Sequence, residues 1–456
     1  MQERVTLTDR QINEELLRSI FVTPMRFWVS ATILALIASL MVISFTFMVI
    51  FGLGLTGLNR PVFWGFMITN FVFWVGISHA GTMISSILRL TQAEWKRPIT
   101  RAAETMTVFS LATAALFPLI HTGRPWRIVY WVFPYDFNHQ IFPNPRSPLV
   151  WDPSAIFTYL TGSALFVLVA LIPDFAAIRD RSTGMRKTIY GALALGWRGT
   201  PRQWKMQTIV GVLLSALILP VFVSVHSIVS WDFAVSLVPV WHATVFAPYF
   251  VIGAVHSGVS AVLTLMAIMR KFFGWRNHLR PEHFDAIGRL LIAVACTWLY
   301  FFMLDVFYAI YAAEPAELVV MELRFFSWPW GVLFWVVLIT SFIIPIPLWL
   351  KRSNRRNITL MFWTSVLVNI GMWSERFWLI VPALEQKEEF TYMWNVYNPN
   401  LVEIGLVIGS VALVGLFLLL FSKVCPPIPL WEIKEGQKFT ADIPLGRMRV
   451  PAIVKE

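Results

Sequence analysis

Two short segments of this chain place a histidine between glycines inside a long apolar run. They are Gly76-Ile77-Ser78-His79-Ala80-Gly81 and Gly253-Ala254-Val255-His256-Ser257-Gly258, and both follow the pattern G-x-x-H-x-G. A histidine is costly in hydrocarbon, so a histidine within a membrane span indicates a function. Two of them, framed by equally spaced glycines, indicate that one helical unit is duplicated.

Other ionisable residues also lie within apolar segments or at their ends. They are Asp174, His226, Asp232, Asp305 and Glu375. Together with His79 and His256, such a series of groups would pass protons across a bilayer. Each residue also has a structural interpretation, in which it bonds a backbone carbonyl or a hydroxyl group and fixes helix packing. The sequence leaves both interpretations open for any one residue, and the set as a whole favours a proton path.

A second candidate site lies where two apolar segments end and begin. His121 ends one segment and Asp152 begins the next, so both are expected at the same membrane face. Roughly 30 residues rich in proline and aromatic residues separate them, which is too long for a simple connection. A carboxylate at a helix N-terminus beside an imidazole is a candidate proton-accepting pair. Asp152 also precedes Pro153, so helix capping is an alternative or additional role.

Two further arrangements have structural alternatives. Ser230-Trp231-Asp232 repeats the Trp-Asp pair of the first site, but the favoured interpretation here is a surface cap with an interfacial tryptophan, since no long loop covers it. His79 and His256 would hold a b-type haem only if they faced each other. Related positions in two self-contained helix bundles need not do so, which argues against a haem at these two histidines.

The composition is that of a membrane protein. Hydrophobic residues make up 57% of 456 residues and charged residues 14%, against about 25% charged residues in soluble domains. The net charge of +11 is spread over many loops, which argues against nucleic-acid binding. Cys296 and Cys425 are the two cysteines, too few and too far apart to predict a disulfide or an iron–sulfur ligand set. The first 26 residues show no cleavable signal peptide.

About ten apolar segments are long enough to cross ~30 Å of hydrocarbon. Basic residues gather around 89–101, 179–205, 270–280 and 351–356, and the connections between these regions are neutral or acidic. By the positive-inside rule, both termini are expected in the cytoplasm. The expected spans are 27–57, 62–89, 102–120, 153–178, 207–229, 241–269, 285–311, 325–350, 358–380 and 401–421.

The duplication extends beyond the two histidines. Each is followed by a basic turn and an Arg-Pro pair, Arg97-Pro98 and Arg280-Pro281, before the next span opens. Spans two to five then correspond to spans six to nine in a parallel repeat. We expect an all-α polytopic protein with a cytoplasmic tail (1–26), a flanking helix (27–57), a first four-helix bundle (58–230), a second one (231–380), an outer loop with the last flanking helix (381–422) and a C-terminal cytoplasmic tail (423–456).

Three strings carry a resemblance to a known family. They are NRPVFWGFMITNFVFWVGISHAGTMIS (59–85), RPITRAAE (97–104) and HTGRPWR (121–127). They resemble the polysulfide-reductase-type (NrfD-like) membrane subunits, and most of all the C subunit of bacterial alternative complex III. The resemblance covers essentially the whole chain.

The resemblance implies a quinol-binding subunit of the bacterial cytoplasmic membrane that itself holds no haem or metal. Quinol, with menaquinol as the expected form, would bind near the outer face at His121 and Asp152, and we add Trp151 and Arg124, the latter as a cation that keeps Asp152 ionised. His79 and His256 would belong to the proton path. Electrons would pass to an iron–sulfur subunit on the outer face and then to c-type cytochrome subunits, with a second NrfD-like subunit in the complex.

Other functions fit parts of the pattern. A close alternative is the membrane anchor of a quinone-linked reductase of the polysulfide or sulfoxide type, with electrons running in the opposite direction. A secondary transporter also has repeats and ionisable groups in its spans, but Pro118, Pro220, Pro248 and Pro345 do not match between the halves as broken transporter helices would. A purely structural anchor would not need His121 and Asp152 at one face.

Overall fold

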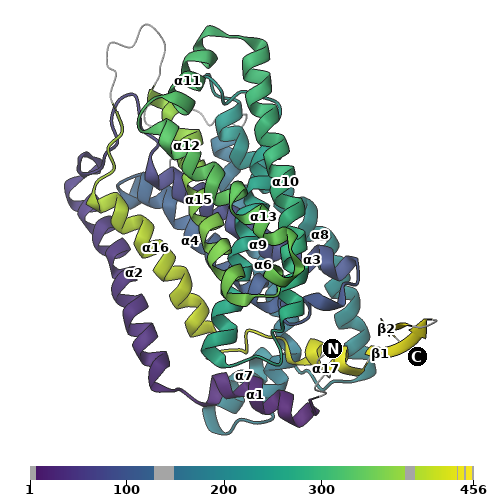
Figure 1. Ribbon diagram of the computed structural model, residues 1–456. Coiled ribbons are helices and arrows are strands. Elements are labelled where there is room, and N and C mark those ends of the chain that lie inside the picture. The colour runs from purple at the N-terminus through teal and green to yellow at the C-terminus, as the bar shows by residue number, and fades with distance from the viewer. Residues whose placement is uncertain (1–6, 128–147, 386–395, 439, 446–447, 454–456) are drawn as a thin grey trace.

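The chain is a bundle of long helices in the computed structural model (Figure 1), which describes residues 7–127, 148–385, 396–438, 440–445 and 448–453. The expected all-α fold is confirmed. Within that part, nine stretches are long and apolar enough to cross a membrane. They are α2 (Met25–Phe51), α3 (Phe66–Leu90), α4 (Thr100–His121), α6 (Pro148–Arg179), α8 (Pro201–Ala234), α9 (Phe246–Phe273), α10 (Pro281–Ala312), the run α12 (Trp330–Leu338), η5 (Ile339–Ile343) and α13 (Pro345–Leu350), and α16 (Leu401–Phe421).

The remaining expected span is α15 (Ile358–Glu385), which has 28 residues. It is not among the nine because it is less apolar, and it buries Glu375 and Arg376 in its middle. The expected count of about ten is reached when α15 is included for its length. The last residues add a feature that the sequence did not predict, an antiparallel hairpin of β1 (Thr440–Leu445) and β2 (Met448–Ile453), with Thr440 opposite Ile453.

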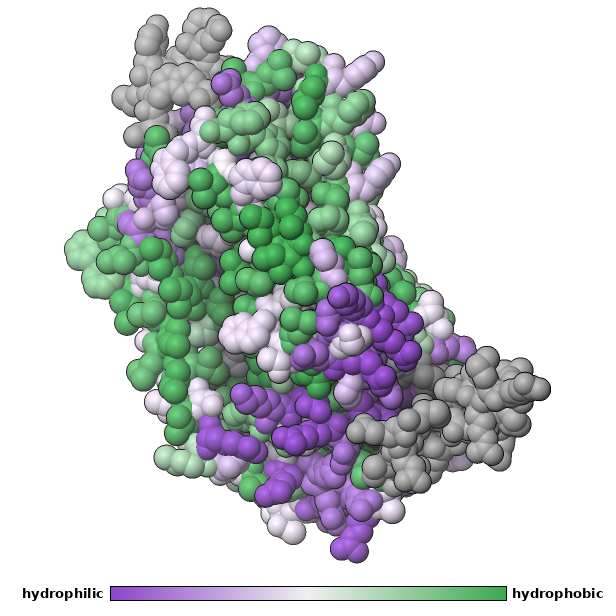
Figure 2. Space-filling view, in the orientation of Figure 1, coloured by the Kyte–Doolittle hydropathy of each residue, from purple (hydrophilic) through white to green (hydrophobic). Residues whose placement is uncertain are grey.

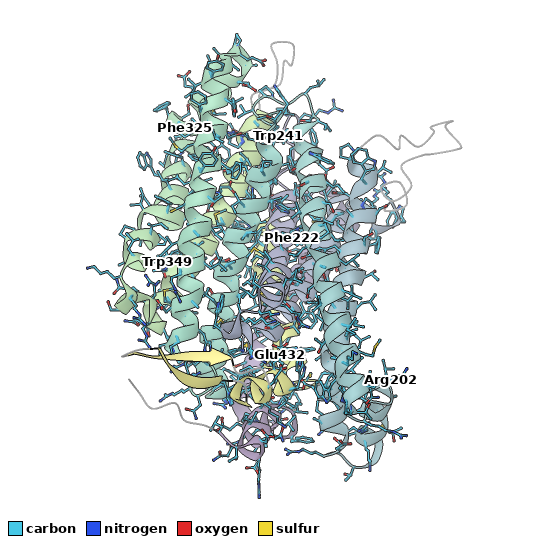
Figure 3. All side chains as sticks on the ribbon, turned by 90° about the vertical axis from the view of Figure 1, so that its right-hand side faces the viewer. Arg202, Phe222, Trp241, Phe325, Trp349 and Glu432 are labelled. Carbon is cyan, nitrogen blue, oxygen red and sulfur yellow. The ribbon has the colours of Figure 1, made fainter. Side chains whose placement is uncertain are left out.

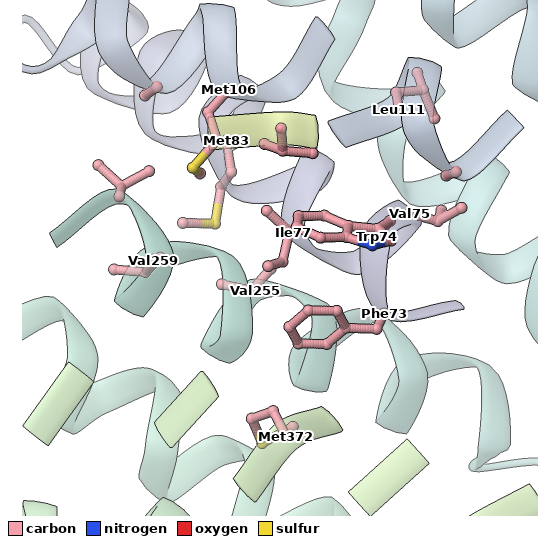
Figure 4. Packing of buried hydrophobic residues seen from close by; sticks show 14 of the residues in the cluster. Phe73, Trp74, Val75, Ile77, Met83, Met106, Leu111, Val255, Val259 and Met372 are labelled. Carbon is pink, nitrogen blue, oxygen red and sulfur yellow. The ribbon is translucent and has the colours of Figure 1, made fainter. Parts of the chain in front are cut away.

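The helices pack as two groups that meet along α3 and α9. In the first half of the chain, α3 contacts α4 and α8, and α6 contacts α4 and α8. In the second half, α9 contacts α10 and α15, and α15 contacts α12 and η5. Figure 4 shows the interface between the groups, where Phe73 and Ile77 of α3 lie beside Val255 and Val259 of α9. Buried apolar contact of this kind fixes the two groups relative to each other.

The two flanking helices, α2 and α16, pack against each other on one side of the molecule (Figure 1). Glycines allow this close approach, because a Cβ on Gly409 would lie 2.6 Å from the Cβ of Met41, and one on Gly405 would lie 2.4 Å from the Ser44 hydroxyl. Small residues are common where membrane helices approach closely. Ser410 joins α16 to α3, since it accepts hydrogen bonds from Asn70 Nδ2 at 2.8 Å and Trp74 Nε1 at 2.9 Å.

The two ends of the molecule differ in character. Both termini lie at one end, with α1 (Asp9–Phe21), α7 (Gly184–Leu193), α14 (Arg352–Arg355) and α17 (Leu430–Lys438). Figure 2 shows hydrophilic side chains gathered there, below a broad apolar band. We call this end the basic side and the opposite end, which carries α11 (Pro315–Phe326), the far side. Three short turns, η1 (Leu53–Leu55), η2 (Glu94–Lys96) and η3 (Pro125–Arg127), complete the connections.

Candidate functional site

Two Trp-Asp pairs meet at the far side of the first helix group. Trp151 and Asp152 lie in the first turns of α6, and Trp231 and Asp232 lie in the last turn of α8. The indole rings of Trp151 and Trp231 pack edge to face with centroids 6.2 Å apart. The carboxyl groups of Asp152 and Asp232 share a side-chain hydrogen bond. Because α6 and α8 pack along each other, residues about eighty positions apart form one site.

The favoured interpretation of Asp232 as a surface cap is therefore wrong. Asp232 is partly buried and bonded to Asp152, whose exposed fraction is 3%. Phe233, next to it, is buried against the Trp241 ring at 5.0 Å, and Trp241 stacks on Trp64 at 5.8 Å. This aromatic packing holds the end of α8 beside α6. Figure 3 shows Trp241 near this end of the bundle.

The paired carboxyl groups can hold and accept protons. A hydrogen bond between two carboxyl groups requires a proton on at least one of them, so the pair can share a proton while the other carboxyl group is ionised. The Oδ1 atoms of both residues are buried and have no hydrogen-bond partner in the described part of the chain. The two tryptophan rings stay partly exposed, 37% for Trp151 and 40% for Trp231. These carboxylate oxygens can accept hydrogen bonds from hydroxyl groups.

His121 and Arg124 lie near the same end but have other contacts. His121, the last residue of α4, is half-buried, and its Nδ1 has no hydrogen-bond partner among the described residues. Arg124 is exposed, and its guanidinium lies 6.0 Å from the centroid of the Trp126 ring. The group that interacts with the Asp152 carboxyl is Asp232. The expected pairing of Arg124 with Asp152 is therefore not the arrangement seen. The rest of the connecting loop, 128–147, lies outside the described residues.

Two of the predicted proton-path histidines face each other in the middle of the molecule. His79 of α3 and His226 of α8 have ring centroids 4.7 Å apart, and both are fully buried. His79 Nδ1 contacts the Val75 carbonyl, and its ring lies 5.1 Å from that of Tyr159. Figure 3 shows Phe222 at this depth, and its ring lies 5.7 Å from that of His79. Both histidines were expected on the proton path, but the sequence could not pair them.

His256 occupies a different environment from His79, although the two share a motif. Its ring lies 6.0 Å from that of Trp298 on α10, and neither ring nitrogen has a hydrogen-bond partner in the described residues. His79 and His256 thus face different helices, α8 and α10. This is not the arrangement of two axial ligands on one haem.

A buried arginine that sequence reasoning missed joins α15 to α9 within the second helix group. Arg376 of α15 donates from Nη2 to the Phe250 carbonyl at 3.0 Å, and its Nη1 lies 3.4 Å from Glu375 Oε2. Its guanidinium lies 4.3 Å from the centroid of the Phe250 ring, which in turn lies 5.9 Å from that of His226. Glu375 also accepts a hydrogen bond from the Tyr249 hydroxyl. An ionisable Glu-Arg pair inside an apolar segment was the signal that could have revealed it.

Asp174 lies at the basic side in a buried ion pair. Its Oδ2 is 2.8 Å from Arg101 Nη1, and each side chain is 1% exposed. Arg101 also donates to the Ala170 carbonyl at 3.0 Å, and Asp174 accepts from the Leu430 amide of α17 at 3.4 Å. These contacts join α4, α6 and α17, which is a structural role for Asp174.

A second charged cluster lies next to this pair. Arg89 is 3.3 Å from Glu432 of α17, and Glu104 accepts a hydrogen bond from Ser85. Figure 3 shows Glu432 at this end of the bundle. Burial lowers the pKa of Lys96, in η2 between the helices, to about 8. Four acidic and basic side chains are thus enclosed where the C-terminal helix covers the first group.

Comparison with known proteins identifies the family. Residues 54–386, well over half of the 456 residues, match the family model described as polysulphide reductase, NrfD. This chain belongs to the NrfD family. The resemblance found in the sequence is confirmed at that level, and the finer likeness to the C subunit of alternative complex III remains a prediction. The chain is therefore an integral membrane protein, with nine apolar stretches in its described part. As an NrfD protein, it is a membrane subunit of a redox enzyme complex.

Three similar proteins cover most of this NrfD chain. The C subunit of the selenate reductase of Mesobacillus selenatarsenatis is 23% identical over 440 residues, which is 92% of this chain and 98% of that protein. A putative membrane C subunit of the dimethyl sulfoxide reductase of Halobacterium salinarum is 24% identical, over 82% of this chain and 86% of that protein. An Hdr-like menaquinol oxidoreductase integral membrane subunit of Archaeoglobus fulgidus is 21% identical, over 84% and 89%.

Proposed function

We propose that this NrfD chain is the quinol-binding membrane subunit of a quinol-oxidising electron-transfer complex. Quinol binds at the far side, beside the Asp152–Asp232 pair and His121, with the ring near Trp151 and Trp231. The observation that carries the proposal is the shared hydrogen bond of two carboxyl groups whose Oδ1 atoms have no other described partner. Buried polar atoms without partners are rare unless a ligand or water completes them.

The chemistry of this site follows from the two protons that a quinol must release when it is oxidised. Oxidation breaks both O–H bonds of the quinol, yields quinone, and releases two protons and two electrons. A quinol loses its electrons readily only as its protons leave, so a base must stand at each hydroxyl group. The ionised member of the Asp152–Asp232 pair accepts one proton and His121 accepts the other. From this end of the molecule both protons leave to the aqueous phase on the far side.

The electrons go to a partner protein. Cys296 is exposed on α10 and Cys425 is buried beside Arg101, so these two residues do not form a cluster ligand set, which needs four cysteines in common cluster types. We therefore assign the acceptor to an iron–sulfur subunit docked on the far side, followed by c-type cytochrome subunits, with a second NrfD-like subunit in the membrane. The name of the Archaeoglobus relative, a menaquinol oxidoreductase subunit, supports menaquinol as the substrate.

The orientation proposed for the complex has the basic side in the cytoplasm of a bacterium. Basic residues of α7 and of the start of α8, such as Arg186, Lys187 and Arg202, support it under the positive-inside rule. The division of the chain into a first bundle (58–230), a second bundle (231–380) and two flanking helices is part of the same proposal. The contacts of α3 with α4 and α8, and of α9 with α10 and α15, support it.

Proton conduction is a further part of this proposal. The His79–His226 pair lies in the first helix group, and Glu375, Asp305 and His256 lie in the second; all five side chains are buried. Such groups are expensive in a membrane unless they have a function. Asp174 lies at the basic side in an ion pair with Arg101. It could exchange protons with these groups only if that ion pair broke, so it is the residue least suited to proton conduction.

Two relatives favour a second assignment. Their names describe subunits of selenate and dimethyl sulfoxide reductases, so the complex would be a quinone-linked reductase in which this chain is the membrane anchor. The two assignments differ in the final electron acceptor and in the direction of electron flow. Stopped-flow spectra of the intact complex, mixed with quinol or with a reduced soluble donor, distinguish them.

The site is tested by substituting His121. In the intact complex, His121→Ala is expected to lower kcat for quinol oxidation about a hundredfold, the usual loss for a missing general base. His121→Gln is the control, because glutamine keeps a hydrogen-bonding side chain but cannot accept the proton, and we expect a similar loss. Turnover at the wild-type rate in both variants would remove His121 from the mechanism.

A further inference from the structure

A second cluster of polar side chains lies on the far side of the other helix group. His242 belongs to the connection between α8 and α9, and Glu314 and Glu317 lie at the start of α11. His242 Nε2 is 3.2 Å from Glu317 Oε1 and 3.8 Å from Glu314 Oε2. One ligand atom from each of the three residues lies within 4.8 Å of the other two. We call these residues the His242 cluster.

The His242 cluster lines a cavity that contains an unpartnered carboxylate. The cavity has a volume of about 220 Å³, and His242, Glu314 and Glu317 line it together with Asp305 of α10. Asp305 is 5% exposed, and its Oδ1 has no hydrogen-bond partner in the described part of the chain. A buried carboxylate oxygen without a donor requires a cation or water beside it. This observation is independent of the cluster and indicates a ligand in the cavity, either a cation or a water molecule bound to one.

We propose that the His242 cluster binds a divalent transition-metal ion of the zinc class. Imidazole nitrogen and carboxylate oxygen are both donor types that zinc binds, and three such protein ligands leave a fourth position open. Ligand atoms about 2 Å from a tetrahedral ion are about 3.3 Å apart. The observed separations of 3.2 Å and 3.8 Å therefore need only a small movement of Glu314. Glu314 is exposed and can make that movement.

Charge and shape favour a divalent ion at this place. The three carboxylates of Glu314, Glu317 and Asp305 face a cavity of adequate size for an ion and its water. Arg324 of α11 interacts electrostatically with Asp305. Its Nη2 donates a hydrogen bond to the Leu379 carbonyl at 2.6 Å and not to Asp305. The open ligand position faces the cavity, so a metal-bound water would donate to Asp305 Oδ1. Asp305 is thus a positioning residue for that water and not a direct ligand.

Metal titration of the purified complex tests this proposal. The complex is treated with a chelator and then titrated with Co²⁺, whose visible absorption reports a four-coordinate site, and with Zn²⁺ in competition. We expect one site in this chain, with affinity lowered at least tenfold in Glu317→Gln and in His242→Gln. The matched control is Glu322→Gln, which removes an exposed carboxylate from the same helix, and we expect unchanged affinity.

A second variant separates the metal site from a simple ion pair. Asp305→Asn keeps all three ligands and loses the acceptor of the bound water, so we expect affinity to fall about tenfold with the cobalt spectrum retained. All variants are compared as assembled complexes of wild-type elution volume. The proposal is overturned if no ion binds at micromolar concentration. It is also overturned if the double variant, with both His242→Gln and Glu317→Gln, binds Co²⁺ as tightly as the wild type. Either outcome would leave His242 as a plain partner of Glu317.

Discussion

Asp152→Asn is expected to slow quinol oxidation by the intact complex at least about a hundredfold. Asparagine keeps the size of the side chain and a hydrogen bond to Asp232, but it cannot accept a proton. Because Asp232 then holds the remaining carboxyl group of the pair, the loss should appear in kcat more than in KM. The measurement is steady-state quinol oxidation with an artificial acceptor. The control is Asp180→Asn, which removes an exposed carboxylate of the basic side and should leave turnover unchanged.

The second acid makes this prediction sharper. Asp232→Asn should produce a loss of similar size, because the two carboxyl groups act as one proton-sharing unit. The double variant Asp152→Asn/Asp232→Asn should then be no slower than the slower single variant, since groups that act together are not additive. Losses that multiply in the double variant would mean that the residues act separately. Wild-type turnover in both single variants would exclude the pair as the proton acceptor.

The largest effect on stability is expected from Arg101→Met. Arg101 and Asp174 are each 1% exposed and 2.8 Å apart, and the substitution leaves the Asp174 carboxylate buried without its cation. Breaking a buried ion pair from one side costs about 3–5 kcal/mol. The control is Arg10→Met, because Arg10 and Glu14 are also 2.8 Å apart but exposed. That exposed pair should contribute little to stability, because water and salt screen it.

The free energy of unfolding can be measured in detergent by steric trapping or by denaturant titration of the purified chain. A second variant distinguishes the loss of charge from the loss of packing. Arg101→Met/Asp174→Leu replaces both charges by apolar groups and should recover most of the stability, since a buried pair often contributes little more than apolar packing. If Arg101→Met lowers the free energy of unfolding no more than Arg10→Met does, the pair at the basic side does not hold α4, α6 and α17 together.

Hydropathy predicted the helices well, because a membrane span depends on the local composition of some twenty residues. The segment expected at 401–421 is α16 with the same limits, and the segment expected at 285–311 is contained in α10. The hairpin of β1 and β2 lies in a segment that the sequence assigned only to a tail. Its two strands of six residues pair in antiparallel register, and no hydrophobic pattern in this segment predicts that pairing.

The candidate site was predicted only in part. His121 and Asp152 were chosen for their positions at helix ends, but the partner of Asp152 is Asp232, about eighty residues further along the chain. Which helices pack side by side is a property of the whole bundle, and local patterns do not contain it. The repeated Trp-Asp dipeptide was the available signal, and it was given a structural interpretation instead.

Buried arginines were the other omission. Arg101, Arg324 and Arg376 are at most 3% exposed, yet basic residues in the sequence were interpreted as markers of the loops between spans. A buried arginine is stable only when acceptors surround it. Arg376 has Glu375 and the Phe250 carbonyl, and Arg324 donates to the Leu379 carbonyl. Most of these acceptors come from helices distant in sequence, so the sequence could not show which groups would pair with each arginine.

The position of a bound quinol analogue in a density map of the intact complex tests the central claim most directly. The claim predicts a ring at the far side of the first helix group, with its oxygen atoms within hydrogen-bonding distance of the Asp152–Asp232 pair and of His121. A large apolar cavity of about 750 Å³ offers a different place for such a molecule. It is lined by α2, α16 and α9 and by residues such as Trp74 and Asn369. A ring in that cavity, with the far-side pair unoccupied, would contradict the account.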